Sequence, residues 1–226
     1  MKYYAIIVAG GSGSRMESSS PKQFLLLEGK PVLMHTLQAF YACCLQPELI
    51  LVLNIHHQQT WEHLCQQHDF TIPHRVVSGG NERFFSVKNG LADIKGEAIV
   101  AIHDAVRPLV STKLILSCFQ NAEENGNAVV GITPTDSVRR IISEEKTEAL
   151  DRNKLVLIQT PQTFRIEQLK KAYLQPFRNE FTDDASVVER AGYPVHVING
   201  ERENIKITYK EDLVLASLFL QKKASE

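Results

Sequence analysis

Hydrophobic residues in the first 130 positions form short continuous runs separated by stretches with helical spacing. Such runs are typical of strands that are buried on both faces of a parallel sheet. They predict strands at residues 4–9, 49–53, 75–77, 98–102 and 128–132. Because strand and helix alternate, the expected fold is α/β: a Rossmann-like three-layer sandwich with a mainly parallel mixed sheet.

Residues at helix ends support this reading. Pro31 can open a helix at its first turn, with Leu33, Leu37, Phe40 and Cys44 along one face. We expect Asn81 to cap the helix that follows the third strand, and Ser111 to cap the helix that Gly126 ends.

Residues 134–155 interrupt the alternation. Residues 137–142 and 149–158 look extended, and the polar stretch 143–148 between them looks like a turn. We predict a β-hairpin arm that projects from the sheet. A lone hairpin is marginally stable in water, so the arm should pack on a second subunit or, alternatively, on its own domain.

Helical spacing returns after Thr160-Pro161-Gln162, at residues 166–174 and 183–191. Strands are expected at 195–198 and 205–207, and Thr208-Tyr-Lys-Glu211 has the form of a capping box that opens the last helix. No interdomain linker interrupts the chain. We therefore expect residues 1–226 to form a single domain, with the arm at about 134–155.

The first strand leads directly into a glycine-rich basic loop. Gly10, Gly11 and Gly13 allow the backbone to turn sharply, and their N–H groups can form a nest for an anion, usually phosphate. Arg15 and Lys22 add two positive charges, and the serines and proline between them disfavour a helix. The sequence predicts a phosphate-binding loop; an ordinary surface turn is the alternative.

Composition limits the partners and the compartment. The 226 residues carry a net charge of −1, which gives no support for a nucleic-acid or membrane partner, and no apolar run is long enough for a membrane span. No segment has the form of a signal peptide. Cys43, Cys44, Cys65 and Cys118 lie among apolar neighbours without a C-x-x-C pair, so we expect buried free thiols and a cytoplasmic location.

Other polar residues follow the third and fourth strands, where ligands bind in doubly wound sheets. Gly80, Arg83 and Ser86 follow the third strand, and the fourth ends in His103-Asp104. A carboxylate there can help to hold Mg²⁺ on nucleotide phosphates. Each residue alone could be structural: a turn cap, a solvated arginine or a packed histidine. Their joint position favours a ligand site.

Motifs spread over almost the whole chain give a specific resemblance. They are Ala9-Gly-Gly-x-Gly-x-Arg15-Met16 with Pro21-Lys22-Gln23, Gly79-Gly80-x-x-Arg83-x-x-Ser86-Val87, His103-Asp104-Ala105-x-Arg107-Pro108, Asp151-Arg152, Gln159-Thr160-Pro161-Gln162, Thr182-Asp183-Asp184-Ala185-Ser186 and Asn204-Ile205-Lys206. Together they resemble the sugar- and polyol-phosphate nucleotidyltransferases, and most closely those that transfer CMP from CTP to methylerythritol phosphate in the non-mevalonate isoprenoid pathway.

The resemblance implies roles for individual residues. The catalytic residues would be Arg15, Lys22 and Lys206. The nucleotide would be bound by Ala9, Gly10, Gly11, Gly13, Gly80, Arg83, Ser86 and Asp104, with Asp104 also near Mg²⁺. Methylerythritol phosphate would be held by Arg107, Arg152, Thr160 and Thr182. The arm, in the resemblance, contributes Arg152 and Thr160 and belongs to the partner subunit of a homodimer.

Some positions depart from the family pattern. The arm begins Thr133-Pro134-Thr135-Asp136-Ser137, so its register is open. Asn81 stands where an acid is frequent in the family, so its role at the cytidine is open. Phe84-Phe85 is bulkier than usual, and no base contact is assigned to that pair.

Other functions fit less well. A ribitol-5-phosphate cytidylyltransferase shares several motifs, but the Asp151-Arg152-Asn153 and Thr-Asp-Asp-Ala-Ser segments favour the methylerythritol enzyme. A module that only binds nucleotides would not need the full charged set. An NAD-binding enzyme is least expected, because no helix follows the glycines directly, no acid ends the second strand, and Met16 stands at the last glycine of the G-x-G-x-x-G pattern.

Overall fold

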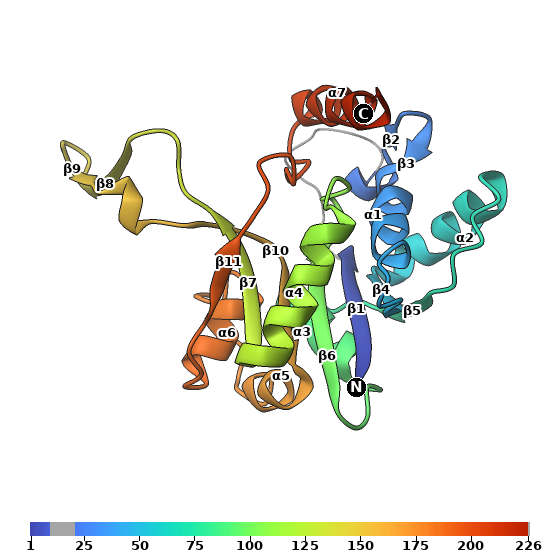
Figure 1. Ribbon diagram of the computed structural model, residues 1–226, viewed down its shortest axis with the longest axis horizontal. Coiled ribbons are helices and arrows are strands. Elements are labelled where there is room, and N and C mark those ends of the chain that lie inside the picture. The colour runs from blue at the N-terminus through green and yellow to red at the C-terminus, as the bar shows by residue number, and fades with distance from the viewer. Residues whose placement is uncertain (10–20, 226) are drawn as a thin grey trace.

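The computed structural model describes residues 1–9 and 21–225, with side chains up to residue 222. Within these ranges seven strands form one sheet in the order β11-β7-β10-β6-β1-β4-β5 (Figure 1). Their bounds are β1 Lys2–Ala9, β4 Glu48–Leu53, β5 Arg75–Ser78, β6 Ala98–Asp104, β7 Asn127–Ile132, β10 Leu157–Arg165 and β11 Val197–Asn199. Neighbouring strands are parallel except at β10, which is antiparallel to both β6 and β7. The predicted mainly parallel mixed sheet is confirmed.

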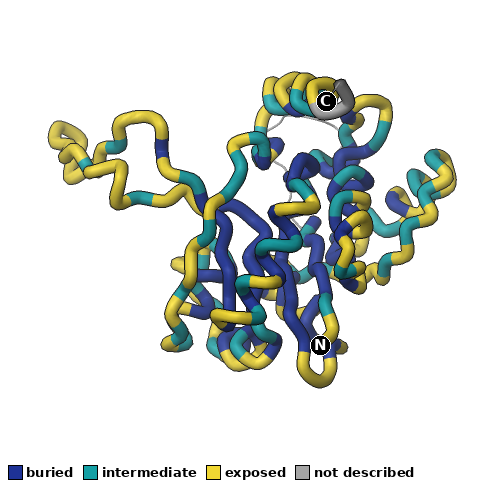
Figure 2. Tube along the Cα trace, viewed as in Figure 1, coloured by how far each residue is buried: buried dark blue, intermediate teal, exposed yellow. Residues whose placement is uncertain are grey.

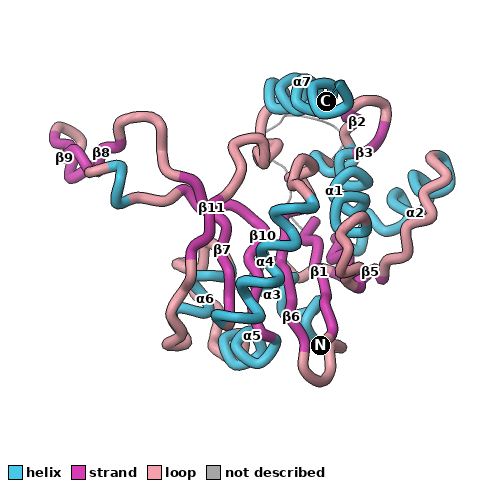
Figure 3. Tube along the Cα trace, viewed as in Figure 1, coloured by secondary structure: helices cyan, strands magenta, loops and turns pink. Residues whose placement is uncertain are grey.

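Helices cover both faces of the sheet, as Figure 3 shows. They are α1 Val32–Tyr41, α2 Gln58–Gln67, α3 Arg83–Leu91, α4 Thr112–Asn125, α5 Ile166–Ala172, α6 Asp184–Arg190 and α7 Lys210–Ser225. Side chains alternate across a strand, so Ala5 and Ile7 of β1 face α1, α2 and α4, whereas Tyr4 and Ile6 face α3, α5 and α6. Two apolar layers therefore enclose the sheet, and the predicted three-layer sandwich is confirmed.

The last helix, α7, packs away from the sheet. Its Ala216 joins a small cluster with Leu27 and Val32, near the two-residue strands β2 (Leu26–Leu27) and β3 (Lys30–Pro31). Three single-turn helices, Lys22–Phe24, Ile55–His57 and Arg152–Lys154, complete the described elements. Among the described residues, no helix has the length and apolar character needed to cross a bilayer.

Several helix ends agree with the sequence, and two differ. Ser111 accepts a hydrogen bond from the Leu114 N–H at 3.0 Å, and Gly126 ends α4 with a left-handed φ of 90°. The residue before α3 is Glu82 and not Asn81, so the predicted cap was one position early. Before α7, the N–H groups of residues 208 and 209 bond to Asp212, one residue beyond the expected Glu211.

Strand β10 was not predicted. Its central residues Gln159, Thr160, Gln162 and Thr163 are polar, and the sequence resembles a turn, yet all four side chains are buried. Gln162 illustrates how this is possible: its Nε2 donates to Asp183 Oδ2 at 2.9 Å, and its Oε1 accepts from the N–H of residue 185 at 2.8 Å. Buried polar groups are tolerated when they are hydrogen-bonded.

The projecting hairpin arm is present as predicted, but its second strand, β9, begins at Lys146 inside the expected turn 143–148 and ends at Leu150, well before residue 158. Strands β8 (Val138–Ser143) and β9 (Lys146–Leu150) pair antiparallel, and the hairpin extends away from the sheet (Figure 1). Figure 2 shows it mostly exposed. Its apolar residues are exposed too: Ile141 is 77% and Ile142 49% accessible.

Two further expectations were wrong. Residues 205–207 form no strand; Ile207 is instead buried in the cluster beneath α7. All four cysteines are free, as expected, and Cys43 and Cys118 are buried, but Cys65 is only partly buried and Cys44, which lies beyond the end of α1, is exposed.

Replacing Gln162 by Leu should lower the free energy of unfolding by about 1–3 kcal/mol. The substitution leaves a helix N–H and a carboxylate oxygen without their buried partner. Urea unfolding measures the change, and Gln67→Leu on the exposed surface of α2 is the control. Equal midpoints for both variants would show that these bonds do not hold α6 to the sheet.

Candidate functional site

A pocket of about 220 Å³ opens at the carboxyl end of β6, where ligands bind in doubly wound sheets. Its walls come from α3, the β6 terminus, β10, the segment before α6 and the loop before α7. The lining residues are Arg83, Asp104, Arg107, Ile158, Gln159, Thr160, Gln162, Thr182, Asp183 and Lys206. Sequence analysis had assigned six of these to the site: Arg83, Asp104, Arg107, Thr160, Thr182 and Lys206.

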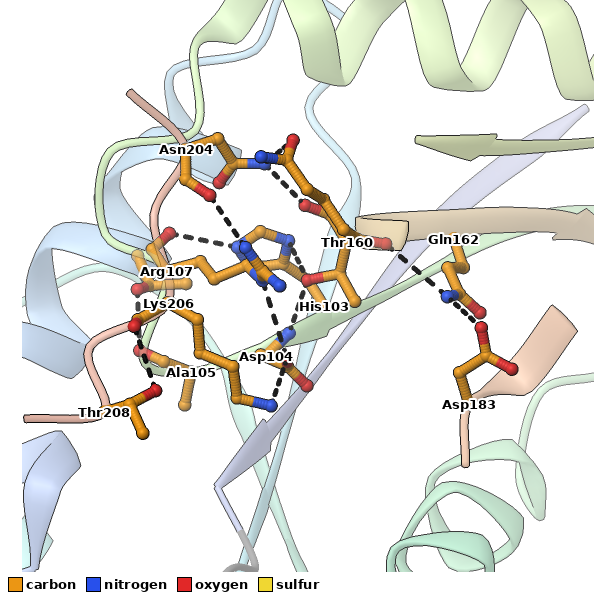
Figure 4. A network of polar contacts seen from close by, with 12 residues as sticks. His103, Asp104, Ala105, Arg107, Thr160, Gln162, Asp183, Asn204, Lys206 and Thr208 are labelled. Carbon is orange, nitrogen blue, oxygen red and sulfur yellow. Dashed lines mark hydrogen bonds and ion pairs between the residues drawn. The ribbon is translucent and has the colours of Figure 1, made fainter. Parts of the chain in front are cut away.

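Asp104 is the centre of the charged cluster in this pocket (Figure 4). Its Oδ2 lies 2.9 Å from Lys206 Nζ and 3.6 Å from Arg107 Nε, and its Oδ1 lies 3.6 Å from Arg83 Nε. The Asp104 side chain is only 11% exposed. Burial raises its pKa, but the charges of Arg83, Lys206 and Arg107 outweigh burial and hold the pKa well below its usual range. Asp104 is therefore ionised over the whole physiological pH range.

Arg83 connects this cluster to the core. Its Nη2 donates to Asp184 Oδ2 at 2.7 Å, and Asp184, which is fully buried, accepts a second hydrogen bond from Tyr173 at 2.6 Å. Burial lowers the pKa of Arg83, but Asp184 and Asp104 outweigh it and raise that pKa. Arg83 thus has a structural partner in addition to its place in the pocket wall.

His103 is buried next to the pocket and links Arg107 to Thr160 through hydrogen bonds. Its Nε2 lies 3.1 Å from the Arg107 carbonyl oxygen, which can only accept, so Nε2 carries the proton. Its Nδ1 therefore accepts from the Thr160 hydroxyl, at 3.1 Å, and Thr160 Oγ1 in turn accepts from the Asp104 N–H. Burial lowers the pKa of His103 to about 4, so the ring is neutral. The packed histidine considered in the sequence analysis is what the structure contains.

The Thr160 contacts correct its expected position. Thr160 lies in β10, at the centre of the sheet, and contacts Asp104 and His103 of the same chain. It does not belong to the arm. Arg152 does: its guanidinium donates to the Thr135 carbonyl oxygen, and it is not among the residues that line the pocket.

Gly80 and Ser86 are not among the residues that line this pocket. A Cβ on Gly80 would lie 2.4 Å from the Cβ of Phe85, so only glycine fits there. Ser86 is buried and accepts from the Gly80 N–H at 3.1 Å. Both residues therefore shape the loop before α3.

The structure describes the residues at the two ends of the glycine-rich loop. Ala9 ends β1, and its carbonyl oxygen accepts from Gln23 Nε2 at 3.2 Å. Lys22 Nζ donates to the Thr208 carbonyl oxygen at 2.6 Å, which brings the loop end to the segment that carries Lys206. Gly10, Gly11, Gly13 and Arg15 lie outside the described residues.

Sequence reasoning assigned no role to several residues that build the site. Gln159, Gln162, Asp183, Asp184 and Asn204 stood in the motifs, and the structure shows that each hydrogen-bonds another part of the site. The motifs were the only signal for them, because the sequence analysis assigned no strand or helix to residues 159–162.

The described residues contain no group of three or more His, Cys, Asp or Glu side chains placed to hold a metal ion. Asp104 is nevertheless compatible with Mg²⁺ that is held mainly by substrate phosphates, as Mg²⁺ commonly is. Within residues 1–9 and 21–225, the ion-pair contact of its Oδ1 is that with Arg83, at 3.6 Å. Arg83, Arg107 and Lys206 would repel a Mg²⁺ ion that carries no anionic ligand. The charges of the pocket are therefore compatible with Mg²⁺ that binds as a complex with nucleotide phosphates.

Arg83→Ala should lower the free energy of unfolding by about 3–5 kcal/mol, because it leaves Asp184 charged and buried without a counter-ion. In an Asp184→Asn background the same substitution should lower the free energy of unfolding by much less. Urea unfolding of the wild type, the two single variants and the double variant measures the coupling between the two residues. Additive costs would mean that this ion pair does not hold α3 to α6.

Comparison with known proteins identifies the family of the chain. The chain matches the family model described as IspD: 2-C-methyl-D-erythritol 4-phosphate cytidylyltransferase, over residues 3–222. It is 48% identical over 220 residues to the protein of that name from Bacteroides thetaiotaomicron, covering 97% of this chain and 100% of the relative. It is 50% identical over 220 residues to that of Porphyromonas gingivalis, covering 97% and 98%.

The fold is similar as well. The crystal structure of 4-diphosphocytidyl-2C-methyl-D-erythritol synthase from Anaerococcus prevotii matches with a TM-score of 0.82 at 28% identity, covering 97% of this chain and 98% of that one. With the family model, these matches extend over nearly the whole chain. The chain belongs to the 2-C-methyl-D-erythritol 4-phosphate cytidylyltransferase family.

Proposed function

We propose that this enzyme transfers CMP from CTP to 2-C-methyl-D-erythritol 4-phosphate, with release of pyrophosphate, in the non-mevalonate isoprenoid pathway. The single observation that carries the proposal is the cluster of Arg83, Arg107 and Lys206 around Asp104, in a chain of this family. Two polyanionic substrates require a surplus of fixed positive charge, and this pocket supplies it. A ribitol-5-phosphate cytidylyltransferase and a binding-only module are not favoured by the family match.

The reaction forms one bond and breaks another at the α-phosphorus of CTP. A phosphate oxygen of methylerythritol phosphate attacks that phosphorus, and the bond to the β-phosphate oxygen breaks, so pyrophosphate leaves with the bonding electrons. In such transfers the protein mainly positions the substrates and neutralises charge. We assign this neutralisation to Arg15, Lys22 and Lys206.

The nucleotide half of the site follows β1 and β5. We propose that Ala9, Gly10, Gly11 and Gly13 offer backbone N–H groups to the triphosphate, and that Gly80, Arg83 and Ser86 shape the cytidine side. The tight approach of Gly80 to Phe85 and the bond from Gly80 to Ser86 support a backbone-lined pocket here. Mg²⁺ would be held by the nucleotide phosphates and Asp104, and it would supply charge neutralisation on the triphosphate.

The second substrate has its own set of residues. We propose that Arg107, Thr182 and Thr160 hold methylerythritol phosphate together with Lys206. Arg107 lines the pocket, and its charge is held there by the 3.6 Å contact of Nε with Asp104 and by the hydrogen bond of Nη1 to the Asn204 carbonyl oxygen. Thr182 is exposed at the rim of the same pocket.

We propose further that the enzyme is a homodimer and that the arm completes the partner's site through Arg152. The exposed Ile141 and Ile142 support this, because an arm with apolar side chains is expected to pack against another surface. Neither a nucleic-acid nor a membrane partner is part of the proposal, and the cytoplasmic location expected from the thiols stays a prediction.

Arg15→Ala and Lys22→Ala should each lower turnover by about 10²–10³-fold, because contacts that stabilise transition-state charge are worth this much. The assay is pyrophosphate release from CTP and Mg²⁺ with methylerythritol phosphate, and with ribitol 5-phosphate as the rival acceptor. Lys95→Ala, an exposed cation before β6, is the matched control. Turnover within threefold of wild type for both site variants would remove them from the catalytic set, and no release with either acceptor would overturn the proposed reaction.

Mixed dimers test whether Arg152 acts in the partner's site. Lys206→Ala and Arg152→Ala homodimers should both be impaired. After random subunit exchange about half of the dimers are mixed, and each mixed dimer has one intact site, so activity should recover to about a quarter of wild type. If Arg152 acts within its own chain, every site lacks one residue and exchange restores nothing. Differently tagged subunits confirm that exchange has occurred.

A further inference from the structure

We infer that Asn204 is a positioning residue for the acceptor-phosphate half of the site, an inference that rests on the proposed function. Asn204 lies in the segment between β11 and α7, which carries Lys206 and has no regular secondary structure. A cation on such a segment keeps its place only if other contacts fix the backbone. The contacts of Asn204 do this.

The Asn204 side chain ties the segment to β10. It is fully buried, and its Nδ2 donates to the Thr160 carbonyl oxygen at 2.8 Å and lies 3.3 Å from Gln159 Oε1 (Figure 4). Both neighbours of the amide nitrogen are oxygens, so the opposite amide orientation would place oxygen against oxygen. The donor group of Asn204 is therefore what joins the segment to the strand.

The main chain of Asn204 fixes the second cation. Its carbonyl oxygen accepts from Arg107 Nη1 at 2.7 Å, while the Arg107 carbonyl oxygen accepts from His103. Arg107 is thus held at both ends. Displacement of Asn204 would move Lys206, two residues along the chain, and would release Arg107 at the same time.

The start of the segment is also locked against β10. A Cβ on Gly200 would lie 2.5 Å from Gln159 Oε1 and 2.8 Å from Val130 Cγ1, and Gln159 Nε2 donates to the Glu201 carbonyl oxygen at 2.9 Å. These contacts leave little freedom for the segment. Of the residues through which the segment contacts β10, namely Gly200, Glu201 and Asn204, Asn204 lies closest in sequence to Lys206.

The test is Asn204→Ser, which shortens the side chain while it keeps the residue polar. We expect the KM for methylerythritol phosphate to rise about tenfold, because the two acceptor cations lose their alignment. The dissociation constant of CTP with Mg²⁺, measured by calorimetry without acceptor, should stay within twofold of wild type. A merely structural residue would not separate the two substrates in this way.

Asn127→Ser is the matched control. Asn127 is equally buried, and it holds the segment before β11 to the start of β7 through bonds with Pro194 and His196, at the end of the sheet opposite to the pocket. It should lower the thermal midpoint as Asn204→Ser does and leave the KM for methylerythritol phosphate within twofold.

A rise of threefold or more in Asn204→Ser alone supports the inference; a smaller rise, or an equal rise in Asn127→Ser, overturns it. If Asn204→Ser does not fold, Gly200→Ala displaces the same segment and is judged by the same limits.

If the wild type itself releases no pyrophosphate, the proposed function fails. The inference about Asn204 is then tested separately, by the effect of inorganic phosphate on the thermal midpoint. Phosphate should then raise the thermal midpoint of wild type and of Asn127→Ser by similar amounts, and that of Asn204→Ser by less than half as much; equal rises overturn the inference.

Discussion

The buried carboxylate of Asp104 is the constraint around which the site is built. An ion that is removed from water loses several kcal/mol of solvation free energy, and nearby opposite charges must restore it. Here the charges come from three parts of the chain: α3 supplies Arg83, the turn directly after β6 supplies Arg107, and the segment before α7, about 100 residues further along, supplies Lys206. One carboxylate at the end of a central strand thus brings these cations together before any ligand binds.

Strand β10 supplies the buried hydrogen-bonding side chains that hold the residues around this cluster. It separates the parallel part of the sheet on one side from β7 and β11 on the other, and it is antiparallel to both neighbours. Through Thr160 it contacts the Asp104 main chain, and through Gln162 it holds the segment before α6. An apolar strand in this place would pack well but would leave the site residues without hydrogen-bond partners.

The sequence predicted the parts of the fold that follow from hydrophobic periodicity, and it failed where burial is polar. Strands β1, β4, β6 and β7 are apolar runs, and they were predicted to within a few residues. Strand β10 was missed because its buried residues are glutamines and threonines, whose burial depends on partners far away in sequence. The strand expected at 205–207 was wrong for the converse reason: its isoleucines pack beneath α7 without joining a sheet. The site residues were predicted from motifs. Arg83 and Arg107 each have a second partner besides Asp104, namely Asp184 and Asn204, and these pairings could be identified only from the folded structure.

These second partners also determine which cation can respond to a substrate. Arg83 is bound to Asp184, and Arg107 is bound to the main chain of Asn204, so neither depends on Asp104 alone. Lys206 has the shortest contact with Asp104 and the most exposed side chain of the three, at 48%. A phosphate that enters the pocket can therefore attract Lys206 at the smallest cost, because an exposed ammonium keeps much of its hydration and has a flexible stem. Under the proposed function, a Lys206 side chain that turned toward the substrate would leave Asp104 with two arginines as counter-ions, so the carboxylate would remain compensated. The arrangement thus combines two guanidinium groups, each fixed by a further hydrogen bond, with one more exposed ammonium group.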